Sequence, residues 1–324
     1  MKERKERMDV QFLDWVKKDK GILISIVMTI VVIGIFQIIN PFFLSAQGRI
    51  SLAYAMSYFL IAACGLTFVI LMGSFDFSIV SLLKLAALLC ALYINRLGLW
   101  VIPLALLVCT GFGFINGLLF VKFKVPSFLA TLGISLVADG IAFYLSRGFL
   151  YTIRDRSFRA LSVTFIGGLP SIFYWGIGIC LVCVIISFCT PFGRRTYAVG
   201  GNMRAARLCG INLNKHRILV FMLSGFLAGL AGVLYMAQFG GGSIEMGADM
   251  MIPLFASVVA GGTALSGGVG GPHRTLLGVI LITWIQAGMS MLAISHDIQL
   301  VTFALIAIGM SIVTTERKMI NVVK

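Results

Sequence analysis

The sequence predicts an all-α polytopic membrane protein with about ten transmembrane helices, some of them short or discontinuous. Hydrophobic residues make up 59% of the chain and charged residues only 12%, whereas a soluble domain has about 25% charged residues. The mean hydropathy is +1.02. The net charge of +14 is typical of the cytoplasmic loops of a membrane protein. Basic residues do not interleave with exposed aromatic residues, so the charge does not favour a nucleic-acid partner.

Ten hydrophobic segments follow from the need for about 20 mainly apolar residues to cross the hydrocarbon core. They cover residues 22–40, 51–72, 79–94, 98–121, 127–146, 169–190, 218–239, 248–262, 275–294 and 298–314. Two of them, 79–94 and 248–262, are short and lie beside the glycine-containing stretches 73–81 and 261–272. Such interruptions in both halves are typical of a transporter that lines a path with backbone groups. The alternative is loose loops combined with close helix packing.

Small residues at helical spacing support close packing elsewhere. Gly113 and Gly117 lie four residues apart in one segment, and Gly225 and Gly229 do so in another. This spacing allows two helix backbones to approach closely and says nothing about cargo.

The distribution of basic residues predicts that both termini are cytoplasmic. With the N-terminus inside, inner Lys and Arg residues outnumber outer ones about threefold. The inner residues are Lys2, Arg4, Lys5, Arg7, Lys17, Lys18, Lys20, Lys122, Lys124, Arg194, Arg195, Arg204, Arg207, Lys215, Arg217, Arg274, Arg317, Lys318 and Lys324. The outer residues are Arg49, Arg96, Arg147, Arg154, Arg156 and Arg159. We therefore expect a cytoplasmic segment over 1–21, a membrane domain over 22–314 and a cytoplasmic tail over 315–324.

The first apolar run is longer than the core of a signal peptide and no small-residue cleavage site follows it, so we expect it to remain as a span. Four of the six outer arginines share the loop 147–162. This loop either receives an acidic face of an extracytoplasmic partner or is a solvated loop without a contact.

The basic island, residues 191–217, is the polar stretch that interrupts the second half of the chain. It carries six basic residues and no acidic one. Asn202 is suited to cap a helix at its start, and Gly210 is suited to the left-handed conformation that ends one. We therefore expect Met203–Cys209 to form a short helix beside the membrane and to act as a cytoplasmic docking surface.

Three ionisable residues, Asp76, Lys84 and Asp139, fall inside the apolar segments or at their edges. Each costs about 2.5 to 3.5 kcal/mol at the centre of a lipid-facing helix, so each should face protein or water. Asp76 either caps the third segment or contacts cargo. Lys84 lies about 12 Å further along a helix, so its partner is Asp139, a cavity water or a polar group of the cargo. A proton relay is disfavoured because the chain has few titratable groups in its spans.

No enzyme site is indicated. His216, His273 and His296 are too scattered for one metal site, and the sequence contains no G-x-x-x-x-G-K-[ST] motif for nucleotide phosphates. Cys180 and Cys183 have C-x-x-C spacing, but inside an apolar helix they are expected to be packing residues. We expect no catalytic residue, cofactor or metal, and ATP would have to be bound by another chain.

Four motifs in order resemble the permease subunits of prokaryotic ABC importers for monosaccharides of the ribose, galactose and arabinose type. The stretch AVGGNMRAARLCGI followed by SGFLAGLAG is similar to that family's A-x-G-G-N-x-x-A-A-R-x-x-G-I and S-G-x-x-A-G-x-A-G. GSFDFSIVS, KVPSFLATLGIS and GGTALSGGVGG are similar to other characteristic stretches of that family. The likeness covers nearly the whole chain.

The resemblance implies a multi-pass subunit of the prokaryotic cytoplasmic (inner) membrane that forms the path for a simple sugar. It implies a second permease chain, identical or different, an ABC ATPase subunit and an extracytoplasmic sugar-binding protein. The implied ATPase-coupling residues are Gly200, Gly201, Asn202, Met203, Arg204, Ala205, Ala206, Arg207, Gly210 and Ile211. The implied path residues are Phe75, Asp76, Phe77, Ser78, Lys84, Thr131 and Leu129 beside Phe128.

The chain departs from the family pattern near this path. Lys84 stands where a small residue is common, and Asp139 where an Arg is common. Arg204 stands in the basic island where the family commonly has Glu. Aromatic faces with a charged donor suit a sugar, a nucleoside or a phosphorylated sugar. A permease for nucleosides or branched-chain amino acids therefore remains an alternative, as does, with less support, a proton-coupled secondary transporter.

Overall fold

The computed structural model describes residues 20–242 and 246–314. Its long helices are α2 (Lys20–Ile39), α3 (Ala46–Leu71), α4 (Ile79–Leu97), α5 (Val101–Val121), α6 (Ser127–Ser146), α8 (Ser171–Cys189), α11 (Leu213–Phe239), α13 (Pro272–Met291) and α14 (His296–Thr314). The shorter α12 (Met251–Ala260) follows the turn η2 (Ala248–Met250). Each of the ten predicted hydrophobic segments thus contains a helix.

The predicted fold class is confirmed. In the described part of the chain, seven stretches are long and apolar enough to cross a membrane, and one of them, Ile79–Val121, contains α4, the turn η1 (Gly98–Trp100) and α5. The shorter apolar helices are Met251–Ala260 and His296–Ile312. The chain is therefore a multi-pass, helical membrane protein.

Two helix boundaries differ from the prediction for local reasons. Helix α4 continues to Leu97 rather than residue 94, and Gly98 ends it with a positive φ of 56°. Helix α11 begins at Leu213 rather than residue 218 because the Asn212 side chain accepts a hydrogen bond from Lys215 N at 3.0 Å. The last basic residues of the island therefore belong to the first turns of α11.

The predicted outer loop 147–162 contains a helix that the sequence analysis missed. Helix α7 (Arg156–Val163) begins where the Asp155 carboxylate accepts a hydrogen bond from Phe158 N at 2.8 Å. Phe158 and Ser162 are buried, and the Ser162 hydroxyl donates to Leu234 O of α11 at 2.8 Å. The loop is thus partly a packed helix, and the Asp155 cap is the sequence signal that could have revealed it.

Two short antiparallel pairs surround α7. Strand β1 (Tyr151–Thr152) pairs with β4 (Gly241–Gly242), and β2 (Phe165–Ile166) pairs with β3 (Leu169–Pro170). The β1–β4 pair joins the segment between α6 and α8 to the chain just after α11, and the β2–β3 hairpin leads from α7 into α8.

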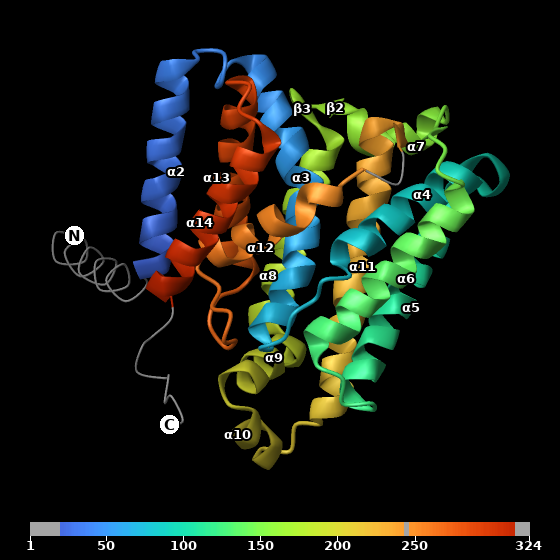
Figure 1. The fold of residues 1–324 in the computed structure, drawn as a ribbon, viewed down its shortest axis with the longest axis vertical. Helices are drawn as coiled ribbons and strands as arrows, with labels where there is room; N and C mark the ends of the chain where they lie inside the picture. Colours follow the sequence, from blue (N-terminus) through green and yellow to red (C-terminus); the bar gives the residue numbers. More distant parts are fainter. Residues whose placement is uncertain (1–19, 243–245, 315–324) are drawn as a thin grey trace, which may run out of the picture.

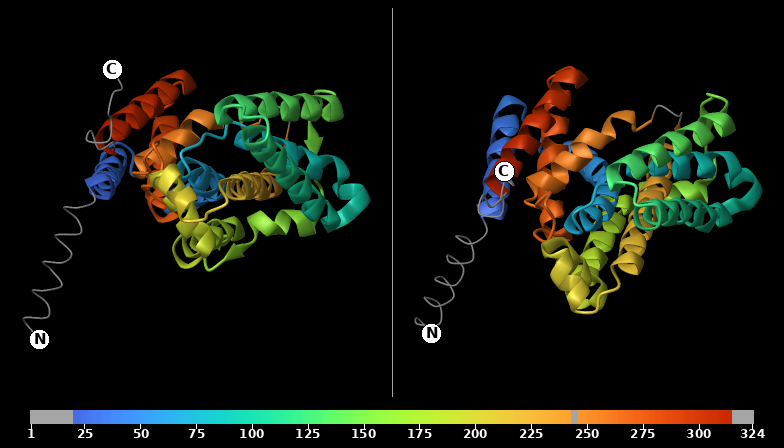
Figure 2. Two further views of the ribbon diagram at one scale, coloured as in Figure 1. Left: turned by 90° about the horizontal axis from the view of Figure 1, so that it is seen from below. Right: turned by 60° about the horizontal axis from the view of Figure 1, so that its bottom comes forward.

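Helices α3 and α11 form the centre of the molecule, with α2, α12, α13 and α14 on one side and α4, α5 and α6 on the other (Figures 1 and 2). Helix α11 lies against α5 through small residues. A Cβ atom on Gly113 would overlap Phe221 O, and one on Gly117 would lie 2.7 Å from Ile218 Cα. The prediction of close packing at these glycines is therefore confirmed.

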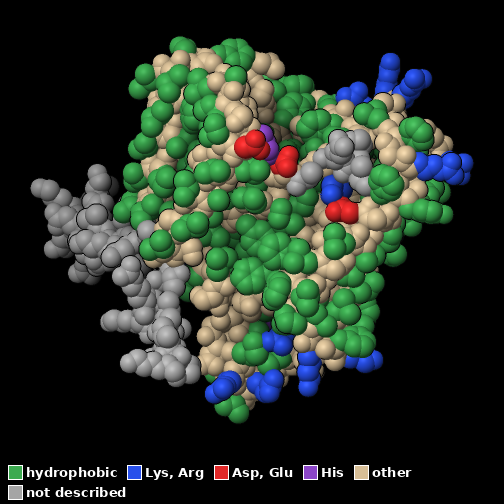
Figure 3. All heavy atoms as spheres, viewed as in Figure 1, with side chains coloured by type: hydrophobic (Ala, Val, Ile, Leu, Met, Phe, Trp, Pro, Cys, Tyr) green, Lys and Arg blue, Asp and Glu red, His purple; other side chains and the backbone are tan. Residues whose placement is uncertain are grey.

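The basic groups lie at opposite ends of the molecule. Helices α9 (Pro191–Gly201) and α10 (Met203–Leu208) are at the lower end in Figure 1, and α7 is at the upper end. Figure 3 shows Lys and Arg side chains at the bottom and at the upper right, with a hydrophobic surface between them. The predicted separation of the basic island from the outer arginines is thus confirmed. The basic residues of 1–19 and 315–324 lie outside the described residues.

Candidate functional site

The first interrupted segment, residues 72–78, connects α3 to α4 and is held by Asp76. The Asp76 side chain is 1% exposed. Its Oδ1 accepts hydrogen bonds from Ser78 N at 2.9 Å and Ser78 Oγ at 2.6 Å, and its Oδ2 accepts one from Ser224 Oγ at 2.7 Å. Of the two interpretations of Asp76, this geometry supports a structural role rather than a cargo contact, because the carboxylate faces protein rather than open space. The predicted cap itself is wrong, since Ser78 is the N-cap residue of α4 and Asp76 bonds to Ser78 rather than to an N–H group inside the helix.

A polar stripe on α6 faces the same segment. Its members recur every four residues and so share one face of the helix; they are Ser127, Thr131, Ser135 and Asp139. Ser127 Oγ accepts a hydrogen bond from Phe75 N at 3.2 Å, and Thr131 Oγ1 accepts one from Phe77 N at 3.0 Å. The stripe therefore supplies partners for backbone N–H groups that the broken helix leaves unpaired.

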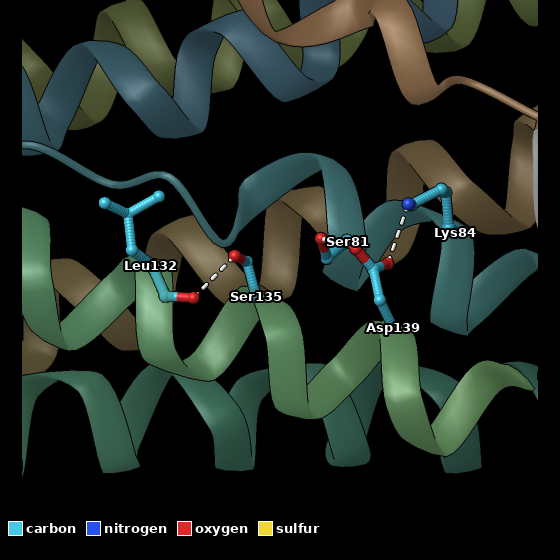
Figure 4. Close-up of polar contacts among 5 residues, drawn as sticks. All are labelled: Ser81, Lys84, Leu132, Ser135 and Asp139. Atoms are coloured by element: carbon cyan, nitrogen blue, oxygen red, sulfur yellow. Dashed lines mark hydrogen bonds and ion pairs between the residues drawn. The ribbon is translucent and has the colours of Figure 1, made fainter. Parts of the chain in front are cut away.

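Lys84 on α4 pairs with Asp139 on α6 (Figure 4). The distance from Lys84 Nζ to Asp139 Oδ1 is 2.7 Å, and Ser81 Oγ donates to Asp139 Oδ2 at 3.0 Å. The Lys84 side chain is 12% exposed and that of Asp139 is 34% exposed. Of the three partners considered for Lys84, the structure places Asp139 in contact. A paired charge is the form in which ionisable groups are tolerated inside a membrane.

Three phenylalanine rings stack between the first interrupted segment and α12. The ring centroids of Phe77 and Phe255 are 5.0 Å apart, those of Phe75 and Phe255 are 6.3 Å apart, and the planes are nearly parallel. Phe75 and Phe77 are 6.5 Å apart. All three side chains are partly exposed. The sequence analysis missed Phe255 because nothing in the sequence indicates which residue of α12 meets residues 75–77.

The predicted path residues therefore fall into three groups. Phe75, Phe77 and Lys84, in α4 and the segment before it, are partly exposed. Asp76, Ser78 and Thr131 are buried behind them and hold backbone or helix ends. Leu129 is 54% exposed and its neighbour Phe128 is 48% exposed; Leu129 lies on the face of α6 opposite the polar stripe.

The second interrupted segment, residues 261–271, is held largely by backbone contacts. Gly268 has a φ of +75° and its N–H donates to Leu71 O of α3 at 2.9 Å. Gly200 at the end of α9 lies against both partners, since a Cβ there would overlap Leu71 O and lie 2.6 Å from Gly268 N. The end of α3, directly before the first interrupted segment, thus meets the second interrupted segment and α9 at one contact between backbones at Gly200, Leu71 and Gly268, which we call the glycine junction.

Tyr197 provides a second link from α9 to this segment. Its hydroxyl donates to Gly270 O at 2.8 Å and lies 3.0 Å from Ser187 Oγ of α8. Its ring stacks on Phe188, with 6.1 Å between the centroids. Helix α9 is therefore anchored to α8 and to the 261–271 segment.

Helix α10 has the predicted caps. Asn202 Oδ1 accepts a hydrogen bond from Ala205 N at 3.0 Å. At the other end Gly210 has a φ of +80°, and Ile211 N donates to Ala206 O at 3.2 Å; this pattern is a Schellman end. The predictions for Asn202 and Gly210 are confirmed, and the helix covers Met203–Leu208.

Helix α10 presents a basic and apolar surface outward. Leu208 is 89% exposed, Met203 is 41% exposed, and the side chains of Arg204 and Arg207 are exposed as well. Arg217 of α11 holds the helix from behind, with its Nη2 2.9 Å from Met203 Sδ and its guanidinium 4.7 Å above the Phe120 ring. The arrangement is that of a small rigid projection with an exposed tip.

Other groups considered in the sequence analysis have structural contacts. His216 Nε2 lies 3.0 Å from Thr196 Oγ1 of α9, and Cys180 and Cys183 are buried. Within the described residues, no group of three or more His, Cys, Asp or Glu side chains could hold a metal ion.

Comparison with known proteins places these features in a family. Residues 48–314 match the family described as the permease component of the branched-chain amino acid transport system. The chain is 34% identical to a ribose import permease of Haemophilus influenzae, over 87% of this chain and 89% of the relative. It is 29% identical to an L-arabinose transport system permease of Escherichia coli, over 89% of this chain and 88% of that protein. No solved structure gives a significant match.

Proposed function

Because the chain belongs to the family of branched-chain amino acid transport system permease components, we propose that it is the permease subunit of an ABC importer for a simple sugar. It is a transport subunit, and ATP is hydrolysed by a separate chain. Its place is the cytoplasmic (inner) membrane of a prokaryote, with 22–314 as the membrane domain. The observation that carries the proposal is the capped, exposed helix α10 within a chain similar to ribose and arabinose permeases over most of its length.

The basic island is the coupling surface in this proposal. The exposed Leu208 and Met203 side chains supply apolar contacts for a groove of the ATPase. Arg204, where the family commonly has Glu, favours a correspondingly acidic groove. Six basic residues without an acidic one also favour the cytoplasmic side for the island.

The glycine junction transmits motion from the coupling surface to the path. A displacement of α9 presses Gly200 against Leu71 at the end of α3 and against Gly268 in the second interrupted segment. Backbone-to-backbone contacts have no flexible side chain to absorb the shift, so the second interrupted segment and the end of α3, which leads into the first, move with α9. Alternating access then needs only a small rigid-body change, biased by ATP binding in the partner.

The end of the molecule that carries α7, opposite the basic island, is the binding surface for the extracytoplasmic sugar-binding protein in this proposal. Arg154, Arg156 and Arg159 border a groove beside α7, and α7 is fixed to α11 by the buried Phe158 and Ser162. A rigid basic surface of this kind fits an acidic face on the binding protein. A second permease chain completes the path along the side of the molecule that carries Phe77 and Lys84.

A co-purification experiment tests the coupling role. Leu208→Glu in α10 should abolish association with the ATPase subunit, because a carboxylate would enter an apolar contact facing an acidic groove. Leu150→Glu, an equally drastic change at the exposed outer end (66% exposed), is the control and should leave association intact. Equal association of both variants would contradict the proposal, as would sugar uptake driven by a pH gradient alone without any ATPase.

The name of the matching family favours a second candidate cargo, a branched-chain amino acid. The two cargoes are distinguished by uptake in proteoliposomes that contain the permease, its ATPase and its binding protein. Uptake of L-leucine rather than of any sugar would establish the second candidate.

A further inference from the structure

The ion pair of Lys84 and Asp139 has hydrogen-bonding capacity left over. An ammonium group has three donors, and an ionised carboxylate has about four acceptor sites. Among the described residues, Lys84 Nζ contacts Asp139 alone, and Asp139 is otherwise bonded to Ser81. With the Lys84 side chain 12% exposed and that of Asp139 34% exposed, the pair presents donors and acceptors side by side at an accessible surface. Vicinal hydroxyl groups, each of which both donates and accepts, match this pattern.

The pair also has no net charge. An unpaired lysine in a low-dielectric site attracts carboxylates and phosphates, whereas a lysine 2.7 Å from a carboxylate has its field largely cancelled. Asp76 is the acidic residue nearest to Lys84 in the sequence. It is buried and accepts hydrogen bonds from Ser78 and Ser224. The site therefore offers polar contacts to a neutral molecule without favouring an anion.

An aromatic surface lies next to the pair along α6. Phe77 is fixed to Thr131 of α6 by its N–H, and Asp139 is two turns further on, which is about 12 Å at the helical rise. Ser135 lies between them on the same face, and its hydroxyl donates to Leu132 O in its own turn. A pyranose or furanose ring is shorter than this interval, so in the arrangement that we infer its C–H face lies on the Phe77 ring and its hydroxyls point toward the pair.

We propose that Lys84, Asp139 and Ser81, together with Ser135 and the stacked Phe77 and Phe255, form a cargo station that accepts neutral polyhydroxylated molecules and disfavours anionic ones. The inference rests on the proposed function as a permease and specifies which cargo this chain passes. A phosphorylated sugar, one of the cargo classes that the sequence leaves open, is thereby excluded. Ser81 is buried and acts by positioning Asp139, and Ser135, also buried, lies beside the interval. Sequence motifs mark neither residue.

The test uses proteoliposomes with the full permease, its ATPase subunit and its binding protein. The probes are the labelled neutral sugars D-ribose, L-arabinose and D-galactose, and the anions D-galacturonate and D-ribose 5-phosphate. The variant K84M/D139L removes both charges at similar side-chain volume, a replacement that is often neutral for stability. The variant K84D/D139K reverses the pair, and Lys122→Met in the exposed loop after α5 is the matched control.

The expected result is neutral-sugar uptake by the wild type and a fall of about tenfold or more in K84M/D139L, the size of losing charged hydrogen bonds. ATP hydrolysis stimulated by the binding protein should persist in that variant, because the coupling helix is untouched. K84D/D139K should recover part of the uptake, and Lys122→Met should behave as the wild type.

Different failures identify different errors. Unchanged neutral-sugar uptake by K84M/D139L overturns the cargo station and leaves the permease function in place. Uptake of only the anionic probes by the wild type also overturns the cargo station and leaves the permease function in place. Absence of any ATP-driven uptake in the wild type, with the three proteins assembled, overturns the proposed function and the station together.

Discussion

The two interrupted segments of this chain, 72–78 and 261–271, satisfy their backbone groups by different means. In the first segment, side chains accept the hydrogen bonds. The Asp76 carboxylate accepts one from Ser78 N, and hydroxyl groups of α6 accept those from Phe75 N and Phe77 N. In the second, the chain bonds largely to other backbone, as in Ala264 N to Val269 O at 3.0 Å and Gly268 N to Leu71 O at 2.9 Å.

This difference in hydrogen bonding suggests different roles for the two segments. A segment held by side chains from behind is free to present other side chains forward, and the first presents aromatic rings and leads into the turn that carries Lys84. The second segment is rich in glycines, and at Gly268 the missing side chain allows another backbone to approach closely. The second therefore suits the transmission of motion from α9, and the first suits contact with cargo.

The largest effect is expected at the glycine junction. Gly200→Ala places a Cβ on Leu71 O, and such overpacking should lower the free energy of unfolding by about 3 kcal/mol or more. Thermal unfolding of the purified permease in detergent measures the change. At the neighbouring Gly201 a Cβ would meet no atom of the described residues within 4 Å, so Gly201→Ala should leave the transition temperature nearly unchanged. Equal stability of the two variants would contradict the close backbone contact at the glycine junction.

The next effect concerns the segment held by side chains. Asp76→Ala removes the acceptor for three hydrogen bonds, from Ser78 N, Ser78 Oγ and Ser224 Oγ. Leaving these buried donors unpaired should cost about 2 to 3 kcal/mol, again measured by unfolding in detergent. Ser224→Ala deletes one of the donors and should cost less. If Asp76→Ala were as stable as the wild type but lost uptake selectively, Asp76 would be a cargo contact instead of a structural residue.

A smaller effect is expected at the start of α10. Asn202→Ala removes the side chain that accepts from Ala205 N and should destabilise the helix by about 1 kcal/mol. Faster hydrogen exchange over residues 203–208, with weaker ATPase association, would report it. Asn214→Ala, in an exposed position of the next helix, is the matched control; faster exchange in that variant alone would contradict the role of Asn202.

The smallest effect concerns Tyr197 and depends on pH. Burial raises the pKa of the Tyr197 phenol above its ordinary value, which is about 10. The unfolded chain therefore ionises first, so the stability from this residue is complete below about pH 10 and is lost as the pH rises further. Tyr197→Phe should cost roughly 0.5 to 1.5 kcal/mol at pH 7 and should weaken the alkaline loss. An identical alkaline profile in both proteins would show that Tyr197 does not contribute.

The sequence by itself determined the elements of the fold. Apolar runs near 20 residues predicted a helix in each of ten segments, because the thickness of a bilayer fixes that length. The caps of α10 were predicted as well, since Asn202 and Gly210 act on atoms only a few residues away. The missed helix α7 has a local signal too, in Asp155 and the spacing of Phe158 and Ser162.

The tertiary structure alone decided which distant residues meet. It brought Asp139 to Lys84, set Phe255 on Phe77, and closed the contact between Gly200, Leu71 and Gly268. Hydrophobic patterning states which residues avoid water but not which helix faces which, because apolar surfaces are interchangeable until side-chain volumes and backbone approach select one packing. Helices and their caps in this chain can therefore be predicted from its sequence. Which residues come together along the proposed path depends on how the helices pack.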